Sequence, residues 1–256
     1  MIKKILILTA NPWDTDRMRL DKEVQGIKKG LRRAKHRDQF DIRSEWAISF
    51  EDLRRALLDN EPQIVHFSGH GEKDGLMLEG DLGIGEAISS EALSELFDLC
   101  SDHVECVILN ACYSASQAAA INKHINYVIG MPGKINDRAA IKFSVGFYDA
   151  LGSDKNVELA FKFGCNAIRP LKIPKKLDPR LFKKKSVHLP QESKDDIGTE
   201  STGSLTPPTT PPSESKKKAS QTINIGNAEK INITDSGDII NNETIYNYLT
   251  NPKKEQ

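Results

Sequence analysis

Two short stretches of the chain place residues capable of covalent chemistry directly after apolar runs. In "QIVHFSGHG", residues 63–71, His70 stands between two glycines at the end of the run. In "VECVILNACYS", residues 104–114, Cys112 follows a similar run and precedes a small-residue segment. A thiol attacks carbonyl carbon as its thiolate, and a nearby imidazole or a helix N-terminus favours that form. The spacing therefore indicates Cys–His chemistry if the fold brings the two stretches together.

Other histidines and cysteines in these stretches point to simpler roles. His66 and His70 could suggest a metal site, but four residues along a strand span roughly 13 Å, too far for both imidazoles to bind one ion. No metal or cofactor is therefore predicted. His66 and Cys106 lie inside apolar runs, which favours a hydrogen-bonded core histidine and an inert core thiol. Cys112 taken alone also fits a buried structural cysteine, and it is the pairing with His70 that favours a reactive one.

Apolar and amphipathic runs alternate along the first two thirds of the chain, which is typical of an α/β fold with a mostly parallel sheet and helices on both faces. In such sheets ligands bind outside the carboxyl ends of the strands, where His70 and Cys112 are expected to lie. Ser49 is the predicted N-cap of one helix, with Asp52 three residues on. The predicted strands lie near residues 2–9, 42–48, 63–68, 104–110 and 127–131, and the predicted helices near residues 17–37, 49–60, 90–100, 114–124, 137–151 and 155–167.

Composition divides the chain into three parts. Residues 1–170 carry the α/β pattern and form the predicted folded domain. Residues 171–220 are basic and then rich in Pro, Ser and Thr, which predicts a disordered, flexible linker. The basic runs are interpreted as a solvated tether, with phosphate or lipid binding as the alternative. Residues 221–250 are rich in Ile, Asn, Thr and Gly and form a short β-prone tail.

Charge and hydropathy exclude several classes of protein. The 36 Lys and Arg residues balance the 36 Asp and Glu residues, so no whole-chain charge favours nucleic acid or a membrane surface. No apolar run reaches the roughly 18–20 residues of a spanning helix, and "MIKKILILTANP" becomes polar too soon for a signal peptide. The four cysteines show no CxxC spacing and indicate reduced thiols. The predicted location is the cytoplasm.

The motifs "HFSGHG" and "LNACYS", separated by "SSEALSELFDLC", resemble the His and Cys motifs of the CHAT family of caspase-like cysteine peptidases. The similarity extends through "ILILTANPWDTDRMRLDKEV" and "YVIGMPGKINDRAAIKFSVGFYDALG", so it covers about residues 1–170. It implies a caspase/gingipain-type α/β fold, a three-layer sandwich. It also implies a cysteine endopeptidase with Cys112 as nucleophile, His70 as base, and the N–H groups of Gly71 and Cys112 as the oxyanion hole. The alternative is a weak or inactive CHAT domain that acts as a protein-interaction module.

The loop "GMPGKINDRAAIKF" bears on cleavage specificity. Family members that prefer basic residues carry a carboxylate in the first substrate pocket, and Asp137 is the acidic residue nearest that position. Asp137 also fits the N-cap of the following helix, and this interpretation is preferred to substrate binding.

The tail contains two alternating triplets that could stack. Alternation turns the isoleucines to one face, while Gly and Asn permit a tight reversal between the triplets. Stacked copies would form a zipper of Ile with Asn ladders, which a single copy cannot. The spacing resembles short amyloid-type signalling motifs of bacterial and fungal innate-immune effectors, and a β-hairpin or a repetitive tail without signalling is the alternative. The residues of this expected assembly motif are Ile223, Ile225, Gly226, Asn227, Ile231 and Ile233.

Together these features predict a thiol protease on a flexible tether. Its expected partners are a protein substrate and a nucleotide-binding receptor with a matching tail motif. Homo-assembly through the tail would activate the peptidase in a defence or cell-death pathway by raising its local concentration.

Overall fold

In the computed structural model, which describes residues 2–184, a six-stranded sheet has the strand order β2-β1-β3-β6-β7-β8. Neighbouring strands run parallel throughout, except that β8 is antiparallel to β7. The predicted α/β class with a mostly parallel sheet is confirmed. The strands of this sheet are β1 (Lys3–Ala10), β2 (Phe40–Glu45), β3 (Ile64–Gly69), β6 (Cys106–Asn110), β7 (Tyr127–Gly130) and β8 (Arg180–Lys183).

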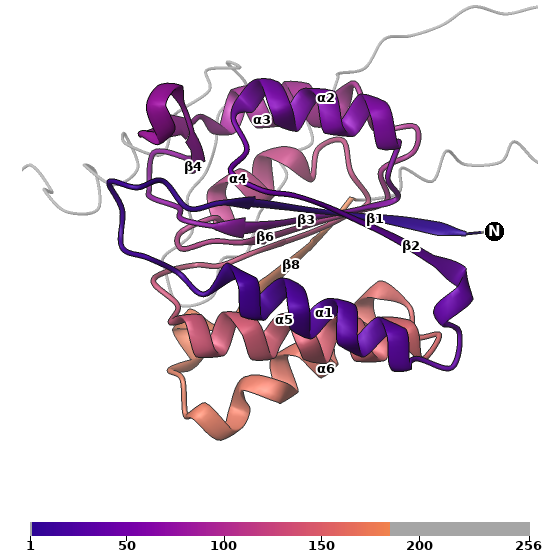
Figure 1. Ribbon diagram of the computed structural model, residues 1–256. Coiled ribbons are helices and arrows are strands. Elements are labelled where there is room, and N and C mark those ends of the chain that lie inside the picture. The colour runs from indigo at the N-terminus through magenta and orange to yellow at the C-terminus, as the bar shows by residue number, and fades with distance from the viewer. Residues whose placement is uncertain (1, 185–256) are drawn as a thin grey trace, which may run out of the picture. The chain divides into compact units, whose positions relative to one another are not determined.

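Helices cover both faces of the sheet and complete three layers (Figure 1). Successive side chains of a strand point to opposite faces, so Leu6 and Leu8 of β1 pack with α2 and α3 while Ile5 and Ile7 pack with α1 and α5. Both faces are apolar, which is why the central strands are nearly continuous hydrophobic runs. The helices are α1 (Leu20–Arg33), α2 (Phe50–Asn60), α3 (Ser90–Asp98), α4 (Ala115–Ile121), α5 (Asp137–Gly152) and α6 (Val157–Ile168), and short 3₁₀ segments span residues 37–39, 81–83, 169–171 and 175–177.

The start of α2 shows the predicted capping pattern. The Ser49 hydroxyl accepts a hydrogen bond from the Asp52 N–H at 3.1 Å, and the Asp52 carboxylate accepts one from the Ser49 N–H at 3.0 Å. This reciprocal pair satisfies two donors that a helix N-terminus otherwise leaves open. The predicted N-cap is confirmed.

A two-stranded antiparallel hairpin, which the sequence did not predict, follows β3. Its strands β4 (Leu76–Glu79) and β5 (Gly85–Ile88) have four residues each, too short for a clear alternation. The hairpin braces the loop after β1, because the Trp13 N–H donates to the Gly83 carbonyl at 3.1 Å and the Asn11 N–H donates to the Glu79 carboxylate at 2.9 Å. It therefore supports a loop that, as described below, contacts His70.

The folded part of the chain extends past the boundary predicted at residue 170. Strand β8 pairs with β7, and its Leu181 and Phe182 pack on opposite faces of the sheet. Arg180 and Lys183 form the two ends of this short edge strand and Lys184 follows it, so its composition resembles that of a solvated tether. The rest of the predicted linker and the predicted tail, residues 185–256, lie outside the described residues. None of the helices in residues 2–184 is long and apolar enough to cross a membrane.

Candidate active site at the carboxyl edge of the sheet

The register of β3 and β6 makes the two segments that carry His70 and Cys112 leave the sheet side by side. Ser68 and Asn110 are the last paired residues of the two neighbouring parallel strands. His70 lies two residues beyond Ser68, and Cys112 lies two residues beyond Asn110. Both residues therefore leave the sheet at the same edge and at the same level, which is the arrangement that the sequence predicts for them.

The His70 imidazole is held by a backbone carbonyl from the loop after β1. Its Nε2 lies 2.6 Å from the Asp16 carbonyl oxygen. A carbonyl only accepts hydrogen bonds, so Nε2 must carry the proton in this contact, and Nδ1 is left as the basic atom of a neutral ring. The Asp16 carbonyl therefore orients the ring and selects its tautomer.

Gly71 lies against the backbone of Cys112. A Cβ atom added at Gly71 would meet the Cys112 carbonyl oxygen at 2.3 Å, closer than real Cβ contacts allow, so only glycine fits here. Gly71 forms an isolated antiparallel bridge with Leu76. The hydrogen bonds beside this bridge are donated by Glu72 and Met77, so the Gly71 N–H takes no part in them. The backbones of Gly71 and Cys112 thus approach each other closely where the reaction is expected.

Cys112 is half-buried, and its thiol donates to the Ile135 carbonyl at an Sγ–O distance of 3.6 Å. The next residue, Tyr113, has a φ of 57°, in the left-handed region that side chains rarely adopt. This sharp turn lets the chain leave β6 and enter α4 at Ala115. The predicted strand-to-helix turn at Cys112 is confirmed. The seven-residue α4 begins three residues after the thiol.

The remaining thiols lie in apolar surroundings. Cys106 is fully buried in β6, and burial raises the pKa of its thiol. Burial also raises the pKa of Cys100 and raises that of Cys165 to about 11. These thiols are therefore held in the neutral, unreactive form. The predicted core role of Cys106 is confirmed.

A buried polar cluster lies directly behind the two strand ends. At its centre the Glu23 carboxylate of α1 is 2% exposed and meets four donors. Its Oε1 accepts from His66 Nε2 at 2.9 Å, from Asn110 Nδ2 at 2.6 Å and from the Ser144 hydroxyl at 2.7 Å, and its Oε2 accepts from the Ser68 hydroxyl at 2.6 Å. His66 is thus a hydrogen-bonded core histidine, as predicted. We call these five residues the Glu23 cluster.

The charge of Glu23 depends on this cluster. Burial alone would raise the pKa of Glu23, but the hydrogen bond and charge of His66, together with the Ser68 and Ser144 hydroxyls, bring the pKa below its ordinary value. A pKa that is lower in the folded than in the unfolded chain means that Glu23 stabilises the fold above its ordinary pKa. That stabilisation is lost as the pH falls through the folded-state pKa.

We expect Glu23→Gln to lower the free energy of unfolding by about 2 kcal/mol near neutral pH, because it removes the charge from a buried, fully hydrogen-bonded site. The difference from wild type should shrink as the pH is lowered into the acid range, where Glu23 itself becomes protonated. Urea unfolding across a pH series measures both effects. The matched control is Glu95→Gln, since Glu95 is exposed. An equal, pH-independent loss in both variants would contradict the expectation.

Asp137 does not cap α5, although the sequence favoured that role. It is the first residue of α5, and the N-cap is Asn136, whose side chain accepts from the Ala139 N–H at 2.9 Å. The N-cap role for Asp137 is therefore wrong. Its carboxylate instead accepts from the Arg19 N–H at 3.3 Å and so joins α5 to the loop before α1.

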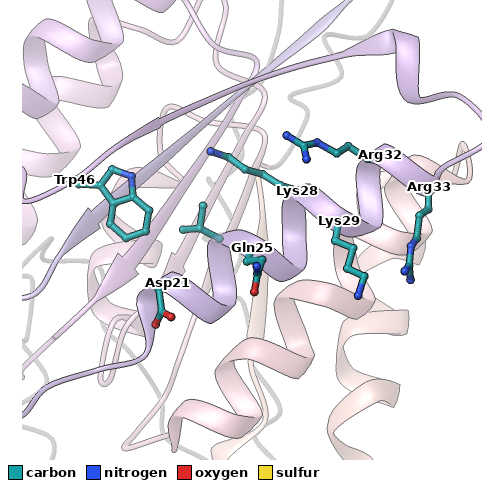
Figure 2. A pocket seen from close by; sticks show the side chains of 8 residues that line it. Asp21, Gln25, Lys28, Lys29, Arg32, Arg33 and Trp46 are labelled. Carbon is teal, nitrogen blue, oxygen red and sulfur yellow. The ribbon is translucent and has the colours of Figure 1, made fainter.

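Two grooves flank the loop before α1. The smaller, of about 390 Å³, adjoins the candidate site, because its lining includes residues 17–19, which directly follow Asp16. The larger, of about 660 Å³, runs along α1, where Lys28, Lys29, Arg32 and Arg33 make it strongly basic beside Trp46 (Figure 2). Among the described residues, His70, Gly71, Cys112 and Asp137 line neither groove.

Sequence reasoning missed two groups of this site. The Asp16 carbonyl carries no sequence signal, because every residue has one. Glu23 did carry a signal, since it interrupts the apolar stripe that Leu20, Val24 and Ile27 form on α1. A carboxylate on the buried stripe of a helix indicates a buried hydrogen-bond partner.

The fold and the chain resemble known proteins. The crystal structure of the Arg-specific cysteine proteinase gingipain R matches with a TM-score of 0.50 and 12% identity, covering 71% of this chain and 46% of that one. A probable protease of Gillisia limnaea is 30% identical over 175 residues, which are 65% of this chain and 30% of that protein. A Roc-COR-CHAT protease of an unknown prokaryotic organism is 26% identical over 180 residues, which are 67% of this chain and 17% of that protein.

The chain thus spans less than a third of the length of these two relatives. Residues 10–163 match the CHAT domain family. This region contains both strand ends of the candidate site and most of the described fold. The caspase/gingipain-like fold that the resemblance implies is confirmed, and the chain belongs to the CHAT domain family.

Proposed function

We propose that the protein is a cysteine endopeptidase in which Cys112 is the nucleophile and His70 is the general base. The observation that supports this proposal is the register of β3 and β6, whose last paired residues, Ser68 and Asn110, each stand two positions before His70 and Cys112 at the carboxyl edge of the sheet. Two relatives that are named proteases support the assignment. The gingipain-like fold is compatible with it.

In the proposed mechanism, His70 Nδ1 takes the proton of the Cys112 thiol while Nε2–H stays on the Asp16 carbonyl. The thiolate attacks the scissile carbonyl carbon, and the oxyanion is stabilised by the N–H groups of Gly71 and Cys112. The imidazolium then protonates the leaving amine, and a thioester to Cys112 remains. Water, deprotonated by His70, attacks this thioester, releases the acid product and restores the thiol.

A peptide probe with an electrophilic carbonyl or acyloxymethyl ketone group tests this function. We expect it to form an adduct with Cys112 of the wild-type protein and none with the Cys112→Ala variant. A CHAT domain that serves only for protein interaction would give no adduct at Cys112 while still binding its partners. Labelling of both forms to the same extent would refute the assignment of the nucleophile.

We propose Asp137 as a contact for a basic side chain of the substrate, since it is acidic and sits beside the loop that holds His70. Asp137→Asn should lower cleavage after Arg or Lys by about 10-fold, because one charge-assisted contact is lost. It should shift the melting temperature little. A peptide-library cleavage profile of the purified protein makes the comparison, and Asp154→Asn, at an exposed position after α5, is the control. A drop in melting temperature with unchanged preference would leave Asp137 a structural link between α5 and Arg19.

We further propose that assembly of the tail activates a cytoplasmic peptidase in a defence or cell-death pathway, with a nucleotide-binding receptor that carries a matching motif as the activating partner. The alternating triplets around Ile223 and Ile231 support this proposal. Copies held together by their tails would raise the local concentration of peptidase domains.

A peptide of residues 221–249 should form thioflavin-binding fibrils at micromolar concentration. Ile225→Asp should prevent this, because stacking would bury an unpaired charge in every layer. Ala228→Asp introduces the same charge outside the triplets and serves as the control. A wild-type peptide that stays soluble when seeded would remove tail assembly from the proposal and leave the peptidase unaffected.

A further inference from the structure

Glu23 is the only buried carboxylate that the structure describes, and the proposed reaction does not use it. A carboxylate loses several kcal/mol of hydration on burial unless hydrogen bonds replace the water. Four donors do so here, and two of them are the side chains of Ser68 and Asn110. An apolar residue would fill this position on α1 without that cost. The cluster therefore calls for an explanation other than stability.

The positions of the donors Ser68 and Asn110 in the sheet suggest that explanation. Ser68 is in β3, Asn110 is in β6, and the two are paired in register at the point where both strands end. Side chains alternate along a strand, so Ser68 and Asn110 share the face of the sheet that α1 covers. One carboxylate thus holds the ends of both strands, through Oε2 on β3 and Oε1 on β6.

The reacting groups follow these ends closely. His70 and Cys112 each lie two residues further, roughly 7 Å along an extended chain. A shift of one strand end relative to the other therefore carries the imidazole away from the thiol. Displacement of reacting groups by about 1 Å can cost about 100-fold in rate.

We propose that Glu23 is a positioning residue for the Cys112–His70 pair, which acts by holding the ends of β3 and β6 through Ser68 and Asn110. The inference rests on the proposed function. Glu23 touches neither the substrate nor the thiol in this role. His66 and Ser144 complete the acceptor pattern of the carboxylate and keep its two oxygens in fixed directions.

The test measures the alkylation rate of Cys112 by iodoacetamide in the full-length protein, followed by mass spectrometry of the Cys112 peptide. A short unstructured cysteine peptide added to every sample is the reference thiol. We expect Glu23→Leu and Asn110→Ala to slow alkylation of Cys112 by at least about 10-fold near neutral pH, and to leave that of the reference peptide unchanged. The difference should close at alkaline pH, where the thiolate forms without help from an imidazole.

Two further variants separate positioning from packing. Glu23→Gln should restore most of the rate, because its amide oxygen can accept from Asn110 while its NH₂ donates to the Ser68 hydroxyl, which keeps one link to each strand. Ser144→Ala removes a donor to the same carboxylate from α5, which is not one of the two strands, so Cys112 should stay nearly as reactive as in wild type. If Glu23→Leu does not fold, the alkylation rates of Cys112 in Asn110→Ala and Ser68→Ala are compared with the rate in Ser144→Ala.

The His70→Ala variant, measured in the same series, distinguishes failure of the positioning role of Glu23 from failure of the proposed Cys112–His70 pair. Slow alkylation in His70→Ala with wild-type rates in the variants of Glu23, Ser68 and Asn110 would overturn the positioning role alone. The same follows if Ser144→Ala slows Cys112 as much as Asn110→Ala does. Wild-type reactivity of Cys112 in His70→Ala would overturn the proposed Cys–His pair, and the inference would fall with it.

Discussion

Replacing either Cys112 or His70 with alanine is expected to lower peptide hydrolysis by at least about 1,000-fold, because each variant removes a group that forms or breaks a bond in the rate-determining steps. Both positions lie beyond the ends of their strands, and Cys112 is only half-buried. The thermal melting curves of both variants should therefore stay close to that of wild type. Hydrolysis of the best substrate from a peptide library, measured with circular dichroism on the same samples, checks both expectations.

Cys106→Ala is the matched control for the loss of a thiol. Cys106 is fully buried in β6, so its removal leaves a small cavity and costs about 1 kcal/mol of stability. Its hydrolysis rate should remain that of wild type. Full activity of Cys112→Ala or His70→Ala under conditions where wild type cleaves would show that another residue carries the chemistry.

Gly71→Ala is expected to be nearly as damaging, although it adds only a methyl group. That group would lie 2.3 Å from the Cys112 carbonyl oxygen and 3.1 Å from Ala111 Cβ. Because the obstructing atom is backbone, the loop that carries Cys112 has to move. We expect the rate of hydrolysis to fall by about 100-fold or more and the free energy of unfolding to fall by about 2 kcal/mol.

Gly80→Ala is the control for this prediction. Gly80 lies between β4 and β5, and a methyl group there would meet its nearest atoms only at 3.3 Å. Kinetics and urea unfolding of the two variants should differ sharply. If Gly71→Ala keeps wild-type rates, the close approach of Gly71 to Cys112 is not required for the reaction.

The sequence by itself determined the six helices, five of the strands of the main sheet, and the strand ends at which the chemistry is proposed. Apolar runs followed by glycine at Gly69 or by small residues at Ala111 mark strands that end in turns, and this pattern is local. His70 and Cys112 could therefore be assigned to strand ends without any knowledge of the fold. The same local patterns identified Ser49 as a helix cap and His66 as a core residue.

Only the tertiary structure decided which of these ends meet and what surrounds them. The pairing of Ser68 with Asn110 joins residues 42 positions apart, and the contact of Glu23 with Asn110 joins residues 87 positions apart. No local periodicity encodes such distances, because they depend on strand order and on which helix covers which face. The Asp16 carbonyl is also invisible in the sequence, since a backbone group has no residue type. Strand β8 was missed for a related reason: its few apolar residues are recognisable only once β7 offers them an edge to pair with.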